Sequence, residues 1–248
     1  MRGSIDLNSD LGEGAGQDDL VMPLISSANI ACAAHAGDEA TMDATVRLAR
    51  RHGVAIGAHP GYRDPANFGR IALDLPPDEL VADLIAQLAA LAAVAARAGT
   101  RPVHVKAHGA LYNQAERDDG VAATIVRAVR TADPTLTLVA PPGSALERAA
   151  GAAGLRVARE GFIDRAYDPD GTLRSRRLPG ALLTDPAAAA QQALGFVRDG
   201  GVRAHDGTFL PLPVDTLCVH GDTPGAPALL RAVREALAQA GVAVRTLP

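Results

Sequence analysis

Short runs in which apolar and polar residues alternate recur along the chain. In 103–107, Val103 and Val105 share one face, His104 and Lys106 share the other, and Gly109 then frees the backbone to turn. Other runs likewise place branched apolar residues on one face and small or polar residues on the opposite face. We predict strands at 4–8, 28–33, 54–58, 103–107, 136–140, 155–160, 215–219 and 242–245.

Helical segments fill the intervals between these strands. Pro77 opens the longest of them, with acidic residues in its first turn, and Gly53 closes an earlier one. We predict helices near 39–52, 77–98, 118–132, 144–153, 186–199 and 225–240. Strand–helix alternation is typical of a parallel sheet covered by helices. Because one strand face is small or polar, as a barrel interior would be, the pattern favours an α/β TIM-like (β/α) barrel of seven to eight mostly parallel strands over an open Rossmann-like sheet.

The chain shows no linker or break in composition that would separate two domains. We therefore expect residues 1–248 to form a single (β/α) barrel domain. The segment 165–181 contains the turn signal Asp168-Pro-Asp-Gly171 and has no helical periodicity. It is interpreted as a hairpin or lid inserted after the sixth strand.

Composition excludes several classes of function. A net charge of -4 leaves no basic footprint, and aromatic residues make up only 3% of the chain, so nucleic acid is not an expected partner. The apolar tract 84–98 is rich in alanine and is interrupted by Gln87 and Arg97, which predicts a soluble helix and not a membrane span. The first residues lack the apolar core of a signal peptide, so we expect a cytoplasmic protein. Cys32 and Cys218 lie in apolar runs and are expected to be buried, reduced thiols.

Four histidines stand at the downstream ends of four different predicted strands: His35, His59, His108 and His220. In a parallel barrel these ends share one rim, where function usually collects. Neutral imidazole is a common metal ligand, but the spacing matches no short local metal motif such as H-E-x-x-H. Each histidine taken alone could instead have a purely structural role. A divalent metal at this rim therefore remains an open alternative.

Lys106 lies on the polar face of its predicted strand, so its side chain is expected to point into the barrel interior. An inward lysine requires a carboxylate, a phosphate or an activated carbonyl as partner. The alternative to a functional role is a structural ion pair with Asp6 or Glu160. Arg165, which leaves the sixth strand, could hold a substrate carboxylate in a bidentate manner.

Two acidic residues flank Gly12 at the end of the first strand. Asp10 shares the inward parity of Asn8, which makes it the better site candidate, whereas the alternative for Asp10 or Glu13 is to cap or charge a helix start. The glycines from Gly12 to Gly16 are a weak phosphate signal, and no P-loop motif occurs in the chain.

Six motifs together resemble one known family, the LamB/YcsF family. They read I-D-L-N-S-D-L-G-E, S-A-N-I-A-C-A-A-H-A-G-D, G-A-H-P-G-Y, K-A-H-G-A-L-Y-N, R-E-G-F-I-D-R-A-Y and V-H-G-D, and they run from Ile5 to Asp222. The resemblance implies an irregular barrel akin to the glycoside hydrolase/deacetylase barrels. It also implies ATP-dependent opening of 5-oxo-L-proline to L-glutamate by a chain of this kind working with two partner subunits, B and C.

The positions that match the family motifs carry the charged and imidazole groups of this chain: Asp10, Glu13, His35, Asp38, His59, Lys106, His108, Asn113, Glu160, Asp164, Arg165, His220 and Asp222. Departures from the family pattern lie beside them. Ser9 stands where cysteine is usual, Ala33-Ala34 replace Gly-Phe, and Ala107 replaces proline. These changes leave the reaction class intact, whereas the choice of lactam is less firmly set.

The resulting hypothesis assigns catalysis to Asp10, Lys106 and His108. Lys106 would face the developing oxyanion or phosphate charge, and His108 or Asp10 would act as general base on the attacking water. Substrate-binding candidates are Asn8, Glu13, His35, His59, Asn113, Glu160, Arg165, His220 and Asp222. ATP with Mg²⁺ is the expected cofactor, and the missing P-loop suggests that the partner subunits bind it. Two alternatives remain, a metal-dependent deacetylase or amidohydrolase that needs no ATP, and a non-catalytic lactam-binding subunit.

Overall fold

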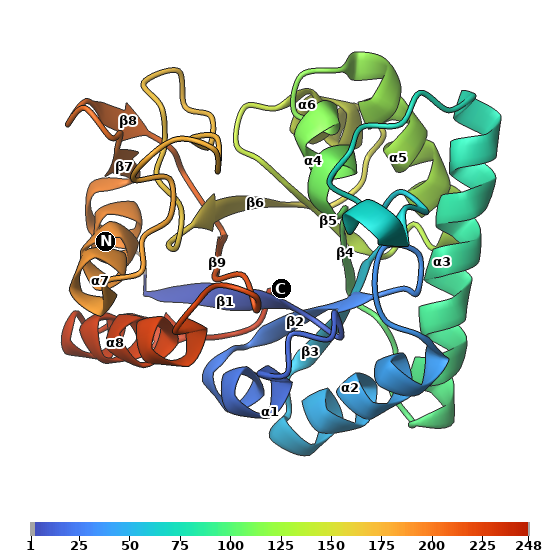
Figure 1. Ribbon diagram of the computed structural model, residues 1–248, viewed down its shortest axis with the longest axis horizontal. Coiled ribbons are helices and arrows are strands. Elements are labelled where there is room, and N and C mark those ends of the chain that lie inside the picture. The colour runs from blue at the N-terminus through green and yellow to red at the C-terminus, as the bar shows by residue number, and fades with distance from the viewer. Residues whose placement is uncertain (1–2, 248) are drawn as a thin grey trace.

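Seven parallel strands close into a barrel in the computed structural model, which describes residues 3–247. Around the barrel the order is β1-β2-β3-β4-β5-β6-β9, and pairing of β1 with β9 closes it. The strands are β1 (Ser4–Leu11), β2 (Ser27–Ala31), β3 (Ala55–His59), β4 (His104–Lys106), β5 (Thr137–Ala140), β6 (Val157–Phe162) and β9 (Thr216–Cys218). The predicted TIM-like barrel of parallel strands is confirmed (Figure 1).

Helices surround the barrel and cover the outward face of its strands (Figure 1). Their bounds are α1 (Asp18–Val21), η1 (Met22–Leu24), α2 (Glu39–His52), η2 (Pro65–Asn67), α3 (Pro77–Arg97), α4 (Gly109–Ala115), α5 (Asp119–Ala132), α6 (Ala145–Ala152), α7 (Pro186–Leu194), η3 (Gly195–Asp199) and α8 (Ala226–Gln239). Helix α3 packs on α5 and α2, while α7 packs on α8 at the opposite side of the barrel. All six predicted helices are present.

Capping residues fix where several helices begin. The Asp38 carboxylate accepts a hydrogen bond from the Thr41 backbone N–H at 2.8 Å and caps α2. This gives a structural role to one family-motif position. Pro77 occupies the first turn of α3, as predicted. By length and composition α3 is apolar enough to cross a membrane, but Leu84 and Leu91 bury one of its faces in the core of the molecule.

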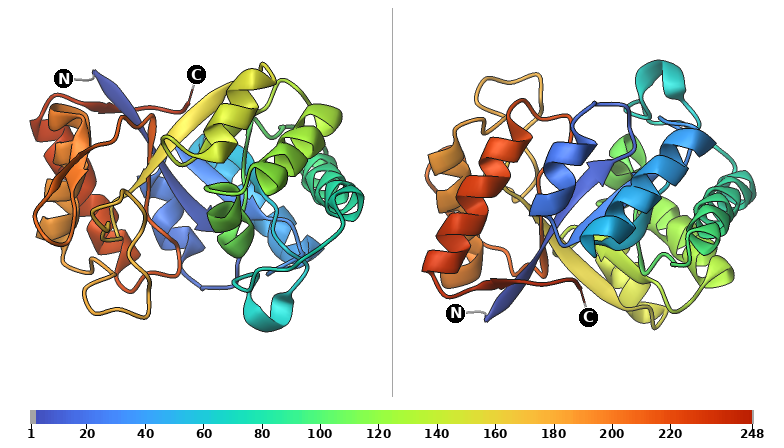
Figure 2. Two further views of the ribbon diagram at one scale, coloured as in Figure 1. Left: turned by 90° about the horizontal axis from the view of Figure 1, so that it is seen from above. Right: turned by 90° about the horizontal axis from the view of Figure 1, so that it is seen from below.

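Strand β10 (Ala243–Val244) lies outside the closed ring. It pairs in parallel with β1 at Ser4 and Ile5, so the predicted strand 242–245 extends the barrel wall and does not help to close it. The two ends of the described chain consequently lie on the same side of the barrel (Figure 2). β1 pairs with three strands, because β9 and β2 take its later residues.

Some short elements were not predicted. Strands β7 (Gly201–Arg203) and β8 (Phe209–Pro211) form an antiparallel hairpin, and α4 follows directly after β4. Each is too short to show a hydrophobic period. The predicted strand 28–33 runs too far, because β2 ends at Ala31 and Ala33 adopts a left-handed φ of 59°. β1 runs on to Leu11, since Asp10 and Leu11 continue its ladder with β2.

Residues 165–182 form an irregular hairpin over the carboxyl ends of the strands, which we call the 165–182 segment. Two antiparallel bridges, Arg165↔Leu182 and Tyr167↔Leu173, define it. Its tip is the predicted turn, where the Asp168 N–H donates to the Thr172 carbonyl at 2.8 Å. Several of its side chains line the pocket described below.

The barrel interior is polar, and the apolar core lies between the strands and the helices. Leu7 and Leu11 of β1 point outward and are fully or almost fully buried in that core. Asp6 points inward, where its carboxylate accepts hydrogen bonds from Ser26 at 2.7 Å, Ser27 at 2.6 Å and Thr216 at 2.5 Å. Burial without such donors would cost several kcal/mol by rough estimate.

Candidate active site at the carboxyl ends of the strands

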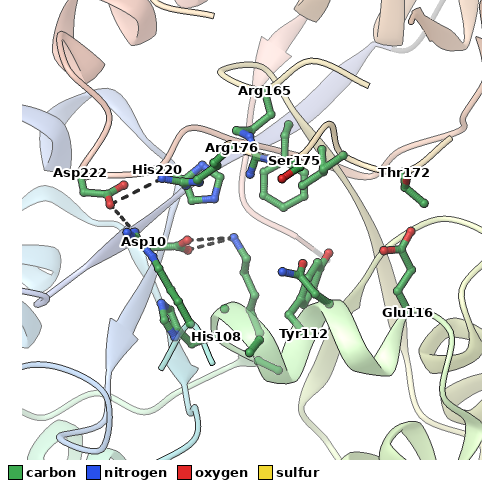
Figure 3. A pocket seen from close by; sticks show the side chains of 18 of the residues that line it. Asp10, His108, Tyr112, Glu116, Arg165, Thr172, Ser175, Arg176, His220 and Asp222 are labelled. Carbon is green, nitrogen blue, oxygen red and sulfur yellow. Dashed lines mark hydrogen bonds and ion pairs between the residues drawn. The ribbon is translucent and has the colours of Figure 1, made fainter. Parts of the chain in front are cut away.

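A cavity of about 600 Å³ opens at the carboxyl ends of the barrel strands (Figure 3). In (β/α) barrels this is the usual position of an active site. The 165–182 segment closes one side of the cavity, and α4 forms another. The lining residues with polar or charged side chains are Asp10, Glu13, His59, Arg70, Lys106, His108, Tyr112, Asn113, Glu116, Arg117, Arg165, Thr172, Ser175, Arg176, Arg177, His220 and Asp222.

Lys106 lies at the floor of this pocket between two carboxylates. Its Nζ is 2.9 Å from Asp10 Oδ1, 2.9 Å from Glu160 Oε1 and 3.2 Å from Cys218 Sγ. Burial alone would lower the pKa of Lys106, but the attraction of Asp10, Cys218 and Glu160 raises it well above the ordinary value. The ammonium therefore stays charged. Lys106 does form an ion pair with Glu160, one of the two partners named in the structural alternative, whereas Asp6 has other partners.

Side-chain amides hold the two carboxylates in place. Asn29 Nδ2 donates to Asp10 Oδ1 at 2.8 Å and also to Asn8 Oδ1 at 2.8 Å. Asn8 Nδ2 in turn donates to Glu160 Oε1 at 3.0 Å, and the Tyr112 hydroxyl donates to Glu160 Oε2 at 2.8 Å. Burial would raise the pKa of Asp10, but His59 and Lys106 hold it well below the ordinary value. Asp10 is therefore a fixed anion.

Glu13 and three histidines form a second group, the Glu13–histidine cluster, made of Glu13, His35, His59 and His108. Glu13 Oε1 lies 3.2 Å from His35 Nε2, 3.8 Å from His59 Nε2 and 3.6 Å from His108 Nε2. The rings of His35 and His108 stack with centroids 3.7 Å apart, and His59 meets both edge-on. Burial lowers the pKa values of His35 and His108. For His59, the attraction of Asp10 outweighs burial and raises its pKa.

Glycines make room for the histidine rings in and beside this cluster. Gly57 leaves space for the His104 ring, because a Cβ on Gly57 would lie 2.0 Å from His104 Nε2. Gly69 has a φ of 59°, and a Cβ there would lie 2.8 Å from His35 Cβ and 2.9 Å from His108 Nδ1. The backbone around Gly69 is therefore packed directly against the histidines.

His220 stands at the same rim but apart from the cluster. Its Nδ1 is 2.8 Å from Asp164 Oδ2, and its ring stacks on Phe162 with centroids 5.2 Å apart. The Thr223 hydroxyl also donates to Asp164 Oδ2 at 2.6 Å. Burial would raise the pKa of Asp164, but the attraction of His220 and these hydrogen bonds lower it.

Arginines surround the mouth of the pocket. Arg70 pairs with Asp222, and Arg176 Nη1 lies 3.9 Å from Asp222 Oδ2. Arg165 Nη2 donates to the Arg174 carbonyl at 2.6 Å, while Arg165 Nε is buried without a hydrogen-bond partner among the described residues. Six basic and four acidic side chains line the cavity, so its balance favours an anionic ligand.

The sequence-predicted residues divide into two layers. Nine line the cavity: Asp10, Glu13, His59, Lys106, His108, Asn113, Arg165, His220 and Asp222. Asn8, His35 and Glu160 lie behind this lining and contact it through the bonds given above. The alternative of a helix cap for Asp10 or Glu13 is wrong, because α1 begins only at Asp18.

Sequence reasoning missed the arginines of the mouth other than Arg165. Arg176 and Arg177 lie in the predicted hairpin or lid, so their position beside the site could have been inferred from that prediction. Arg70 and Arg117 lie in or just after irregular segments, where no period indicates a direction. Cys32 and Cys218 are buried free thiols as predicted, but the contact of Cys218 with Lys106 was not foreseen.

Proteins of known name match this chain along its whole length. One from Methylococcus capsulatus, named as the A subunit of 5-oxoprolinase, is 53% identical over 252 residues, covering 100% of this chain and 97% of the relative. Another of that name from Symbiobacterium thermophilum is 54% identical over 245 residues, covering 97% of this chain and 94% of the relative.

Solved structures agree with the observed fold. The lactam utilization protein from Thermus thermophilus superposes with a TM-score of 0.93 at 48% identity, covering 98% of this chain and 100% of that one. A family 4 carbohydrate esterase from Streptomyces lividans has a TM-score of 0.51 at 12% identity, covering 100% and 94%, and shares the fold alone. The family model for the LamB/YcsF family matches residues 5–248. This chain therefore belongs to the LamB/YcsF family.

Proposed function

We propose that this protein is the A subunit of an ATP-hydrolysing 5-oxoprolinase, which opens 5-oxo-L-proline to L-glutamate. The observation that carries this proposal is identity above 50% over the full length to relatives named as the A subunit of 5-oxoprolinase. The chemistry of the pocket supports it, because 5-oxoproline offers a carboxylate and a polarisable lactam amide to the groups found there.

Arg165 is the best-placed residue to bind the substrate carboxylate. Its side chain is largely buried at the pocket wall, and its Nε has no hydrogen-bond partner among the described residues. A buried guanidinium donor without a partner is costly, and a carboxylate would satisfy it with a charge-assisted bond. The surplus of cationic side chains around the cavity acts in the same direction.

Lys106 supplies the fixed positive charge at the pocket floor. Asp10 and Glu160 orient its Nζ, so the ammonium needs little reorganisation to interact with negative charge that develops on the lactam oxygen or on a phosphoryl group. Asp10 is committed to Lys106 and Asn29, which makes it a positioning anion and a poor candidate for general base.

The Glu13–histidine cluster is the better candidate for activating the attacking water. Glu13, His59 and His108 all line the cavity, as Lys106 does. A water held there could pass its proton to an imidazole or to the Glu13 carboxylate while it attacks the lactam carbon. This replaces the choice between His108 and Asp10 with a group in which Glu13 takes part.

ATP and partner subunits complete the proposal. Amide hydrolysis in an unstrained lactam is difficult near neutral pH, and phosphorylation of the amide oxygen would make its carbon electrophilic. The chain has no P-loop motif, so ATP with Mg²⁺ is assigned to subunits B and C, with this chain acting as their soluble, cytoplasmic partner.

Reconstitution with subunits B and C tests the assignment. With 5-oxoproline present, ADP and glutamate should appear together in equal amounts, and omission of 5-oxoproline should abolish the ADP signal. Arg165→Gln should raise the KM for 5-oxoproline, because it removes the guanidinium that holds the carboxylate. Efficient hydrolysis of an amide substrate without ATP would contradict the proposal and favour an ATP-independent amidohydrolase.

A further inference from the structure

The Glu13–histidine cluster has the composition and spacing of a metal site. We propose that Glu13, His35, His59 and His108 bind one divalent transition-metal ion of the Zn²⁺ class. One ligand atom from each of the four lies within 4.8 Å of all the others. Three imidazole nitrogens with one carboxylate oxygen suit Zn²⁺ or a neighbouring transition metal better than Mg²⁺ or Ca²⁺, which prefer oxygen ligands.

The distances within the cluster agree with a single shared ion. Bonds of 2.0–2.1 Å to a tetrahedral ion place two ligand atoms about 3.4 Å apart. Glu13 Oε1 lies 3.2 Å, 3.6 Å and 3.8 Å from the Nε2 atoms of His35, His108 and His59. The three Nε2 atoms thus lie about one tetrahedron edge from the same oxygen. The rings of His35 and His108, which are parallel, would turn toward each other for both lone pairs to reach one ion.

The hydrogen bonding of His59 is the strongest argument for a cation. His59 Nδ1 lies 2.7 Å from the Lys106 carbonyl oxygen, which can only accept, so Nδ1 carries the proton. Nε2 then faces Asp10 Oδ2 at 3.5 Å and Glu13 Oε1 at 3.8 Å. Nε2 is buried without a hydrogen-bond partner among the described residues. A metal cation held by Nε2 would give this nitrogen a partner, and both carboxylates would attract it.

The three histidines of the cluster are buried and closely packed. His35, His59 and His108 are nearly inaccessible to solvent. Gly61 packs against two of the rings, and a Cβ there would lie 3.0 Å from His35 Nδ1 and 3.3 Å from His108 Nδ1. The carbonyl that orients His59 belongs to Lys106, and such outer contacts commonly fix the tautomer of metal-binding histidines.

The proposed ligand set includes only three of the four histidines at the rim. His220 is engaged by Asp164 and Phe162, and Glu13 takes the fourth place in its stead. When bound, such an ion would supply Lewis acidity and lower the pKa of a coordinated water, so the cluster would activate that water through the ion and not as a general base. Metal binding itself requires neither the partners nor the lactam, so it can be tested independently of the proposed 5-oxoprolinase activity.

The first experiment measures metal on the whole chain, purified without a polyhistidine tag. Elemental analysis should find close to one equivalent of a transition metal per chain. Stripping with a chelator and titrating ZnCl₂ calorimetrically should show one saturable site, with a higher melting temperature after reloading. Absence of a saturable equivalent in the stripped wild type would overturn the proposal and leave an imidazolium–carboxylate cluster.

Variants then test the ligand set. Glu13→Gln and His35→Gln should each weaken Zn²⁺ binding at least about tenfold. The matched control is His220→Gln, a pocket histidine outside the set, which should retain the wild-type metal content and affinity. Circular dichroism of each metal-free variant checks that it is folded. If His220→Gln loses the ion while Glu13→Gln keeps it, the ligand assignment is wrong. Failure of 5-oxoprolinase reconstitution would not affect either metal result.

Discussion

Lys106 is the residue whose charge the interior depends on most. Its side chain is only 3% exposed, and the two carboxylates that it neutralises are also buried. Removing one partner of such a buried group leaves charge without compensation, which is generally costlier than losing the pair altogether. A structural role and the proposed catalytic role therefore coincide at this position, and experiments must separate them.

Lys106→Met should lower turnover of the reconstituted complex at least about tenfold, or roughly 1.4 kcal/mol. It should also reduce the free energy of unfolding by about 3–5 kcal/mol, because Asp10 and Glu160 lose their cation. Steady-state kinetics and urea denaturation measure the two effects.

A double variant and a surface control make this result interpretable. Lys106→Met with Glu160→Gln removes one uncompensated carboxylate and should recover part of the stability without recovering turnover. Arg63→Gln breaks an exposed pair with Asp83 and should cost less than about 1 kcal/mol. Near-normal turnover by a folded Lys106→Met complex would assign Lys106 a purely structural role.

Asp164 predicts a specific dependence of stability on pH. Its pKa is lowered in the folded protein, so its stabilising contribution is complete above the unfolded-state pKa of about 3.9 and is lost as the pH falls through the folded value. Asp164→Asn should therefore reduce the free energy of unfolding at pH 7, and the difference from the wild type should shrink below about pH 4. Denaturant titrations from pH 7 to pH 3 measure it. A difference that grows toward acid would contradict this explanation.

The alternation of side chains along each strand predicted which residues share the rim, but not which of them are in contact. Alternation placed Asp10, Lys106 and His108 correctly at the interior or its carboxyl edge, because the side-chain period of a strand is strict. It could not predict that Glu13 would join the histidines in place of His220. Glu13 follows the end of β1 in a loop, where direction depends on backbone turns and not on a period.

At the scale of elements, long periodic segments were predictable and short ones were not. α2 begins and ends where predicted, since Asp38 caps one end and Gly53 the other. α4 and the β7–β8 hairpin escaped prediction because three to seven residues carry too little pattern. Their formation depends on contacts with the rest of the molecule, which a local reading of the sequence does not contain.

The 165–182 segment should contribute to substrate binding more than to chemistry. Arg176 lines the mouth of the pocket and is partly exposed, so its attraction for an anionic substrate is screened and amounts to roughly 1 kcal/mol or less. Arg176→Gln should raise the KM for 5-oxoproline up to about fivefold while kcat changes little. Arg198→Gln, an exposed arginine outside the pocket, is the control. A large fall in kcat with an unchanged KM would place Arg176 at the reacting atoms.

At the scale of the whole molecule, the barrel provides a cavity of about 600 Å³, and the sequence contains no recognisable nucleotide motif. The glycines from 12 to 16 lie beside Asp10 and Glu13, whose carboxylates would repel phosphate unless a cation intervened. The purified chain should therefore be folded but have negligible 5-oxoprolinase activity, and equilibrium dialysis should detect no tight ATP binding. Adding subunits B and C should bring both ADP and glutamate formation. ATP-dependent turnover by the chain alone, unchanged by the partners, would place the nucleotide inside the barrel.

The pairing of β1 with β9 also governs how the protein is made. The hydrogen bond between Thr216 and Asp6 joins residues that are 210 positions apart in the sequence. The first strand to be synthesised, β1, therefore cannot complete its pairing until β9, near the end of the chain, has been made. At about 5–20 residues per second, roughly 10–40 s pass between the synthesis of these two residues. During that interval one edge of β1 has unpaired backbone groups, and its inward side chains lack Thr216 and the Glu160 network. A nascent chain that stops before β9 thus contains Lys106 and every cluster histidine without the enclosed pocket that they line.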